Sequence, residues 1–187
     1  MIVETLVMCF LVINYHIDSR DQHTEGKACQ QDVGLRFTVR RLKDGLEPSI
    51  QLATFKKDDT KTLCLHEEAL TLLEDISKPV AILSICGPYR TGKSYFLSRV
   101  LGTTDAFKTS PTNNACTLGI WMATKVLDCG DFVVVLLDTE GTDAARGKQS
   151  SIYGDVKKSV ILCTLISSYF IYNTLGAVKE EDLQRMR

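Results

Sequence analysis

Apolar residues in this chain fall into short runs whose spacing alternates between that of strands and that of helices. Residues 80–86 form a nearly continuous apolar run of strand length, and residues 132–137, Phe-Val-Val-Val-Leu-Leu, are the most strongly apolar strand candidate. Such runs are typical of strands buried on both faces of a sheet. Each run is followed by glycine and polar residues. The pattern therefore predicts two central strands that end in polar loops.

Weaker patterns surround these two strands. Residues 49–55 and 61–65 alternate between apolar and polar positions on either side of a polar turn, which predicts a β-hairpin. Residues 67–76 carry leucines and an isoleucine at helical spacing, and this helix must end before Pro79. The other expected elements are a short strand at 35–39, a helix after 94, a strand at 119–127 forming a hairpin with 132–137, a helix at 152–165, a strand at 166–173 and the start of a helix at 178–187.

Residues 87–94 read Gly-Pro-Tyr-Arg-Thr-Gly-Lys-Ser and fit the phosphate-binding pattern G-x-x-x-x-G-K-[ST]. In this P-loop pattern the glycines let several backbone N–H groups converge on a phosphate, and the following helix adds the partial positive charge of its N-terminus. We expect Lys93 to reach the β and γ phosphates and the Ser94 hydroxyl to bind Mg2+. A strand before the loop and a helix after it is the context that this chemistry requires.

A second motif, Asp138-Thr-Glu-Gly, follows the apolar strand at 132–137 directly. Asp and Gly are common wherever a strand ends in a turn. A carboxylate at the end of a buried strand, with glycine three residues on, is also what a Walker B element needs. We therefore expect Asp138 to order Mg2+ through water and the Gly141 N–H to meet the γ phosphate.

Together these features predict an α/β fold of the P-loop NTPase type: a mostly parallel sheet in three layers, with helices on both faces and antiparallel hairpins at its edge. Residues 1–46 are expected to be a weakly structured leader, and residues 47–187 a nucleotide-binding domain. The apolar run at 6–13 has signal-peptide length but follows Glu4 and precedes no typical cleavage site. A strand, a local hydrophobic plug or an irregular leader are the other interpretations.

The charge balance and the cysteine spacing indicate which partners and which cellular compartment to expect. The chain has 187 residues with 22 Lys+Arg against 23 Asp+Glu, a net charge of −1. This balance gives no reason to expect nucleic acid or an anionic membrane as a partner, and the sequence shows no membrane anchor of its own. The 7 cysteines are scattered without a C-x-x-C pair. Reduced thiols in a cytoplasmic protein are therefore expected.

Four stretches carry a family resemblance: residues 87–94, Thr117-Leu-Gly-Ile-Trp-Met, Leu136-Leu-Asp-Thr-Glu-Gly and Ser167-Ser-Tyr-Phe-Ile-Tyr-Asn. From about residue 49 to the last residue, the chain resembles the large GTPase (G) domain of guanylate-binding proteins, in the dynamin-like superfamily. An arginine inside the P-loop together with Asp-Thr-Glu-Gly separates this family from small GTPases.

The resemblance implies Mg2+-dependent hydrolysis of GTP to GDP and phosphate, and nucleotide-dependent pairing with a second copy or with related G domains. It also implies that Thr117 coordinates Mg2+ in the triphosphate state and that Arg90 is the arginine supplied by the family's own P-loop. The candidate catalytic residues are Arg90, Lys93, Thr117 and Gly141. The candidate nucleotide-binding residues are Gly87, Tyr89, Arg90, Thr91, Gly92, Lys93, Ser94, Tyr95, Asp138 and Gly141. The candidate metal ligands are Ser94, Thr117 and, through water, Asp138.

The sequence departs from the family pattern in three places. Ala115 stands where the family usually has a serine that helps to position water. The segment 141–147 is shorter than the corresponding segment of the family and carries different charges. The family's guanine-reading Arg-Asp pair and helical stalk would lie past residue 187. Two alternatives therefore stay open: a catalytically weak nucleotide-binding module that pairs with full-length relatives, and an ATP-using P-loop kinase.

Overall fold

The structure is a computed structural model that describes residues 37–55, 62–107, 119–139, 141, 150–174 and 180. The chain divides into two units, Met1–Arg36 and Phe37–Arg187, and every described residue belongs to the second unit. The predictions for the apolar run at 6–13, for the polar turn after residue 55 and, apart from Glu180, for the helix at 178–187 lie outside the described residues.

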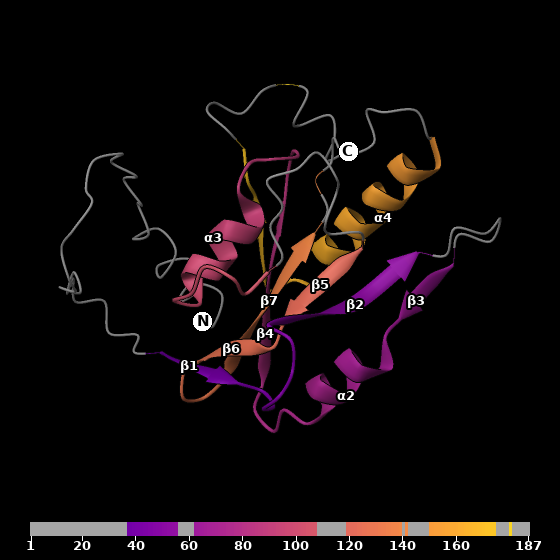
Figure 1. The fold of residues 1–187 in the computed structure, drawn as a ribbon. Helices are drawn as coiled ribbons and strands as arrows, with labels where there is room; N and C mark the ends of the chain where they lie inside the picture. The colour runs from indigo at the N-terminus through magenta and orange to yellow at the C-terminus, as the bar shows by residue number, and fades with distance from the viewer. Residues whose placement is uncertain are drawn as a thin grey trace, which may run out of the picture. The chain divides into compact units, whose positions relative to one another are not determined.

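Within the described residues, one sheet and three helices make up the second unit (Figure 1). The strands are β1 (Thr38–Arg41), β2 (Ser49–Phe55), β3 (Leu63–Leu65), β4 (Val80–Cys86), β5 (Ile120–Ala123), β6 (Lys125–Asp128), β7 (Val133–Thr139) and β8 (Tyr169–Tyr172). The helices are α2 (Glu67–Glu74), α3 (Lys93–Val100) and α4 (Ser150–Ile166).

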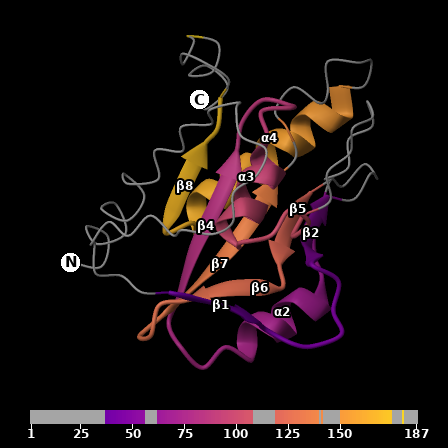
Figure 2. The ribbon, with the colours of Figure 1, turned by 60° about the vertical axis from the view of Figure 1, so that its left-hand side comes forward.

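The sheet is built outward from β7. β4 pairs with β7 along one edge in parallel, and β8 continues the parallel arrangement on the far side of β4 (Figure 2). Along the other edge of β7, β6 pairs antiparallel with its beginning and β5 with its end. β2 and then β3 extend the sheet beyond β5, whereas β1 extends it beyond β6. The predicted hairpins β2–β3 and β6–β7 are both confirmed.

The sequence predicts a mostly parallel sheet, and this is wrong for the described residues. Only the pairings of β4 with β7 and of β4 with β8 are parallel, and α4 makes the connection from β7 to β8. The remaining pairings are antiparallel. The single strand predicted at 119–127 is also divided, since Thr124 leaves the ladder: its N–H donates to the Pro48 carbonyl (3.0 Å) and its hydroxyl to the Glu47 carbonyl (2.7 Å).

Helices cover both faces of the sheet, as predicted. Successive side chains of a strand point to opposite faces. On one face, Val135 and Leu137 of β7 belong to a buried cluster with Leu72 of α2 and Cys163 of α4. On the opposite face, Asp138 of β7 meets α3 through a hydrogen bond from Ser94. The central strands therefore lie between α3 and the other two helices.

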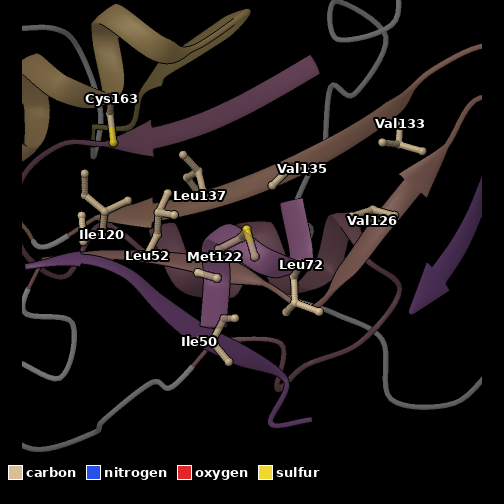
Figure 3. Close-up of a cluster of buried hydrophobic side chains, with 12 residues drawn as sticks. Ile50, Leu52, Leu72, Ile120, Met122, Val126, Val133, Val135, Leu137 and Cys163 are labelled. Carbon is tan, nitrogen blue, oxygen red and sulfur yellow. The ribbon is translucent and has the colours of Figure 1, made fainter. Parts of the chain in front are cut away.

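The core cluster joins the antiparallel and parallel parts of the sheet (Figure 3). Ile120, Met122 and Val135 are fully buried, and Leu52 and Leu72 nearly so. Burying such a side chain stabilises the fold by roughly 1.5–3 kcal/mol. The cluster therefore holds β7, and with it the residues that follow β7, in a fixed place. The apolar periodicity of β2, α2 and β7 predicts these positions.

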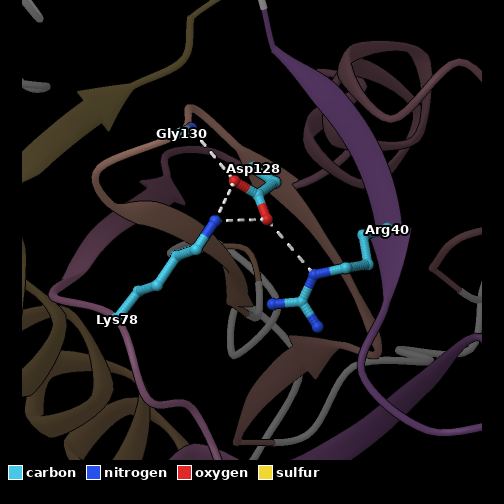
Figure 4. Close-up of polar contacts among 4 residues, drawn as sticks. All are labelled: Arg40, Lys78, Asp128 and Gly130. Atoms are coloured by element: carbon cyan, nitrogen blue, oxygen red, sulfur yellow. Dashed lines mark hydrogen bonds and ion pairs between the residues drawn. The ribbon is translucent and has the colours of Figure 1, made fainter.

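A polar cluster fixes the edge of the sheet at β1 (Figure 4). Asp128, at the end of β6, accepts hydrogen bonds from Lys78 Nζ (2.7 and 2.9 Å) and from the Gly130 N–H (3.0 Å). Arg40 Nε of β1 lies 3.4 Å from Asp128 Oδ2. The hydrogen bond from Lys78, followed by that from Gly130, lowers the pKa of Asp128. One carboxylate thus connects β1, β6 and the segment before β4.

From the lowered pKa of Asp128 we predict how the substitution Asp128→Asn changes stability at different pH values. A carboxyl group whose pKa is lower in the folded state stabilises the protein above its unfolded-state pKa of about 4, and this stabilisation is lost as the pH falls through the folded-state pKa. Wild type should therefore be more stable than Asp128→Asn at pH 7, and the difference should shrink below about pH 4. Urea unfolding at pH 7 and pH 3 measures it.

Asp131→Asn is the matched control, because it removes the same charge at an exposed position in the same hairpin. It should leave the unfolding free energy nearly unchanged at both pH values. An Asp128→Asn effect of equal size at pH 7 and pH 3 would contradict the ionic role.

Candidate functional site

The loop between β4 and α3 has the backbone of a phosphate-binding turn. Three of its residues have positive φ: Gly87 (138°), Arg90 (62°) and Gly92 (83°). At Gly87 a Cβ atom would lie 2.1 Å from the carbonyl oxygen of Asn173, so only glycine fits. Gly92 is the N-cap of α3. The predicted order of strand, glycine loop and helix is confirmed, with the helix beginning at Lys93 itself.

The side chain of Lys93 folds back over this loop. It is 6% exposed, and its Nζ donates to the carbonyl of Pro88 at 2.8 Å. The Thr91 hydroxyl donates to the same carbonyl at 3.1 Å. The Pro88 oxygen therefore draws the end of the loop toward its beginning. The ammonium group is held within the turn, where the sequence motif places its contact with phosphate.

Asp138 lies directly beside the first turn of α3. It is fully buried, and the Ser94 hydroxyl donates to its Oδ2 at 2.5 Å. Its other carboxylate oxygen, Oδ1, meets no hydrogen-bond partner among the described residues. Burial raises the pKa of Asp138 to about 6, although the bond from Ser94 and the charge of Lys93 oppose the rise. The structure thus brings together Ser94 and Asp138, two of the residues that the sequence analysis assigns to Mg2+.

Gly141 packs against the P-loop. A Cβ atom at this position would lie 2.5 Å from the Cα of Tyr89, so the backbone of residue 141 can approach the loop this closely only without a side chain. The structure therefore brings the glycine of the Asp-Thr-Glu-Gly motif to the same loop that holds Lys93. The direct contact with the P-loop backbone was not predicted.

The aromatic residues and Arg90 form the outer part of the site. Arg90 is exposed, and its guanidinium carbon lies 5.5 Å from the centre of the Tyr89 ring. Stacking of this kind contributes about 0.5–1 kcal/mol at exposed positions. Tyr95 of α3 is 51% exposed. Arg90 thus sits at the surface beside the buried Lys93. Thr117 and Ala115 lie outside the described residues, so the coordination of Mg2+ by Thr117 in the triphosphate state stays a prediction.

Two residues that the sequence analysis missed contact the predicted site. Ser98, fully buried on α3, donates to the Ser94 carbonyl (2.8 Å) and accepts from the Phe107 N–H (3.2 Å), in the segment that follows α3. Asn173 donates through Nδ2 to the Thr91 carbonyl at 2.7 Å. Ser98 could have been found as a small polar residue four positions after Ser94, and Asn173 as a polar residue at the end of a strand.

The oxygen atoms of Ser94 and Asp138 fit a magnesium ion. Mg2+ is a hard cation that prefers oxygen ligands and usually keeps several waters. A hydroxyl oxygen and a carboxylate oxygen without a hydrogen-bond partner among the described residues are both at hand. These donors suit a cation that is shared with phosphate oxygens.

The loop, the buried Lys93 and the Ser94–Asp138 pair define a nucleotide-binding protein of the P-loop class. The sequence profile described as "Guanylate-binding protein, N-terminal domain" matches residues 60–187. The chain belongs to the guanylate-binding protein family, and its fold is accordingly that of a P-loop GTPase domain.

Curated relatives agree with this assignment. The chain is 34% identical to guanylate-binding protein 4 of Homo sapiens over 139 residues, which cover 70% of this chain and 20% of that protein. It is 32% identical to guanylate-binding protein 7 of Mus musculus over 139 residues, with the same coverage. It is 33% identical to guanylate-binding protein 2 of Homo sapiens over 139 residues, 69% of this chain and 22% of that protein. The chain thus matches about a fifth of the length of these relatives.

Two further observations concern the setting of the site. Among the residues that the structure describes, no helix combines the length and the apolar character that crossing a lipid bilayer requires. The described cysteines Cys64, Cys86, Cys129 and Cys163 are free thiols.

From the raised pKa of Asp138 we predict how the stability of the metal-free and nucleotide-free protein depends on pH. A carboxyl group whose pKa is raised on folding, here to about 6, supports the fold fully below its unfolded-state pKa near 4 and loses this contribution as the pH rises through 6. Two pKa units correspond to roughly 3 kcal/mol. The stability of wild type relative to Asp138→Asn should therefore fall by about this amount between pH 4 and pH 7.

Urea unfolding in the presence of EDTA measures this difference. Asp128→Asn is an internal comparison, because its pH dependence has the opposite sign. A difference between wild type and Asp138→Asn that stays constant from pH 4 to pH 7 would contradict the raised pKa.

Proposed function

We propose that this protein binds GTP with Mg2+ and hydrolyses it to GDP and phosphate. The observation that carries the proposal is the meeting, at one loop, of the buried Lys93, the buried Ser94–Asp138 pair and the backbone of Gly141. These are the parts that phosphoryl transfer from a nucleotide requires. Membership of a family named for guanylate binding supports GTP as the nucleotide.

Phosphate binding falls to the loop and to Lys93. The backbone N–H groups of residues 87–94 and the N-terminus of α3 would surround the phosphates, and Lys93 would exchange the Pro88 carbonyl for phosphate oxygens. Ser94, Thr117 and, through water, Asp138 would hold Mg2+. The ion would supply positive charge that offsets the negative charge of the phosphates.

Hydrolysis adds a water molecule to the γ phosphorus and breaks the bond to the oxygen that bridges the β and γ phosphates. The bond electrons stay on that oxygen, which leaves with GDP. The N–H of Gly141 would support the γ phosphate, and Arg90 would stabilise the negative charge that develops on the bridging oxygen. Arg90 is exposed at the surface of the loop, so its side chain would have to turn inward to reach the phosphates. Pairing with a second G domain is the proposed cause of this movement.

Lys93→Ala tests the phosphate site. Losing a charge-assisted contact to phosphate should weaken binding by about 1.5–3 kcal/mol or more, which is at least tenfold. Titration with a fluorescent GTP analogue measures the affinity. Lys93→Met retains most of the aliphatic stem and should fail in the same way, which separates loss of charge from loss of packing.

Arg99→Ala is the matched control, because it removes a cation from the exposed side of the same helix. It should bind as wild type does. A Lys93→Ala variant that binds within twofold of wild type would exclude the P-loop assignment. Competition between GTP and ATP for the site decides between a GTPase and the ATP-using alternative.

Arg90→Ala tests the catalytic role. An arginine that acts mainly in the transition state should leave GTP affinity nearly unchanged, while kcat falls by at least about a hundredfold. Arg90→Lys should restore little, since lysine lacks the planar fork. Phosphate release is measured over a range of protein concentrations, because pairing predicts that specific activity rises with concentration.

Two outcomes would revise this mechanism. Weakened GTP binding with an unchanged kcat would make Arg90 a binding residue. Tight GTP binding by wild type without phosphate release, even in a single turnover, would favour the non-hydrolysing module that pairs with related G domains.

A further inference from the structure

Asn173, the residue after β8, contacts both ends of the P-loop. Its N–H donates to the carbonyl of Cys86 at 2.8 Å, immediately before the loop. Its carbonyl oxygen would lie only 2.1 Å from a Cβ atom built at Gly87, so the first residue of the loop packs directly against Asn173. Its side-chain Nδ2 donates to the carbonyl of Thr91 at 2.7 Å, near the end of the loop. A single residue from a different strand therefore fixes the width of the turn.

The hydrogen bond to Thr91 also sets the direction of one peptide group. A carbonyl can only accept, so the amide nitrogen of Asn173 must be the donor. In a planar trans peptide the C=O and the N–H point in opposite directions, and the described residues contain no cis peptide bond. A bond that holds the Thr91 carbonyl toward Asn173 therefore holds the Gly92 N–H away from it.

The Gly92 N–H belongs to the group of amides that a phosphate-binding loop presents to its ligand. Gly92 is the N-cap of α3 and precedes Lys93 directly. The first N–H groups of a helix have no partner within the helix, which is why anions bind there. The direction of this peptide group and the position of the following lysine are thus linked to Asn173.

We propose that Asn173 is a positioning residue for nucleotide binding, which holds the Thr91–Gly92 peptide in the orientation that binds phosphate. The proposal rests on the proposed function and adds a residue outside the P-loop, magnesium and arginine motifs. Asn173 acts through the loop, so its loss should weaken GDP and GTP alike and leave kcat nearly unchanged. A catalytic residue would show the reverse pattern.

Asn173→Ala is the first test, with the full chain and a fluorescent GDP analogue as the probe. Loss of one hydrogen bond should raise the dissociation constant about three- to tenfold. Ser168→Ala is the matched control. The Ser168 hydroxyl accepts from the Ile82 N–H and so also joins the β8 region to β4, but at the end remote from the loop. This variant should bind within twofold of wild type even if its Tm falls.

Asn173→Asp supplies a second test that depends on protonation. The side chain has the same shape, but an ionised carboxylate cannot donate to the Thr91 carbonyl, whereas the protonated acid can. The ratio of mutant to wild-type dissociation constants should therefore be large at pH 8 and should shrink as the pH falls to about 4, where an ordinary aspartic acid is half protonated. Taking the ratio removes the effect of phosphate protonation, which wild type shares.

Amide hydrogen exchange provides a readout that needs no nucleotide. In Asn173→Ala the amides of residues 89–92 should exchange faster than in wild type, with little change along β4. Equal affinities, within twofold, for wild type, Asn173→Ala and Asn173→Asp would overturn the positioning role. So would a Ser168→Ala effect as large as that of Asn173→Ala, because the cause would then be loosening of β8.

The two proposals fail in different ways. Wild type that binds no nucleotide would refute the proposed function, and the positioning role would fall with it. Wild type that binds while the Asn173 variants bind equally well would refute the positioning role alone. If Asn173→Ala does not fold, Asn173→Asp compared at about pH 4 and at pH 8 decides the question.

Discussion

The parallel pairing of β7, β4 and β8 is the constraint on which the site depends. Ile85 of β4 lies opposite Asp138 of β7, and Cys86 lies opposite Tyr172 of β8. Three strands therefore end at the same level, and the residue that closes or follows each strand reaches the same loop. Residues that carry chemistry gather at the carboxyl ends of parallel strands for this reason. A shift of one residue in either register would turn Asp138 or Asn173 to the other face of the sheet.

Burial gives the site its electrostatic character. Lys93 and Asp138 are both buried, and burying a charge is unfavourable unless hydrogen bonds and an opposite charge compensate. The Pro88 carbonyl serves Lys93, and the Ser94 hydroxyl serves one oxygen of Asp138. The pKa of about 6 at Asp138 means that this compensation is incomplete. Burial also raises the pKa of the Cys86 thiol to about 12, so this neighbour stays neutral.

Much of the fold could be predicted from local patterns. β2 and β4 have the predicted boundaries, because each is a short apolar or alternating run that ends in glycine or polar residues. The pairing of distant strands could not be predicted in this way. The sheet is mostly antiparallel because strands that do not follow one another in the chain, such as β1 and β6 or β2 and β5, also pair antiparallel. Thr124 divides one predicted strand by bonding to Glu47 and Pro48. Both facts depend on contacts between residues far apart in sequence.

The candidate site likewise combines residues that motifs predict with contacts that no motif predicts. Lys93, Ser94 and Asp138 follow from motifs, since each motif specifies the residue type that phosphate or Mg2+ needs. The close packing of Gly141 on Tyr89 and the bond from Asn173 to Thr91 do not follow from any motif. An asparagine at the end of a strand has many possible partners, and only the register of β8 on β4 selects the Thr91 carbonyl.

The bond between Lys93 and the Pro88 carbonyl explains how the loop can be both ordered and ready to bind. Lys93 is buried, with 6% of the residue exposed, so its charged ammonium group needs a hydrogen-bond partner. A carbonyl supplies that partner, but as a neutral acceptor it lacks the attraction between opposite charges that an anionic acceptor adds. In the proposed function, a phosphate oxygen would therefore take the place of the Pro88 carbonyl at Lys93. The carbonyl set free can still accept from the Thr91 hydroxyl, which already contacts it.

Because Asn173 independently holds the Thr91 carbonyl, the exchange at Lys93 need not open the turn. Phosphate binding would then change the partner of one side chain and leave the backbone of the loop in place.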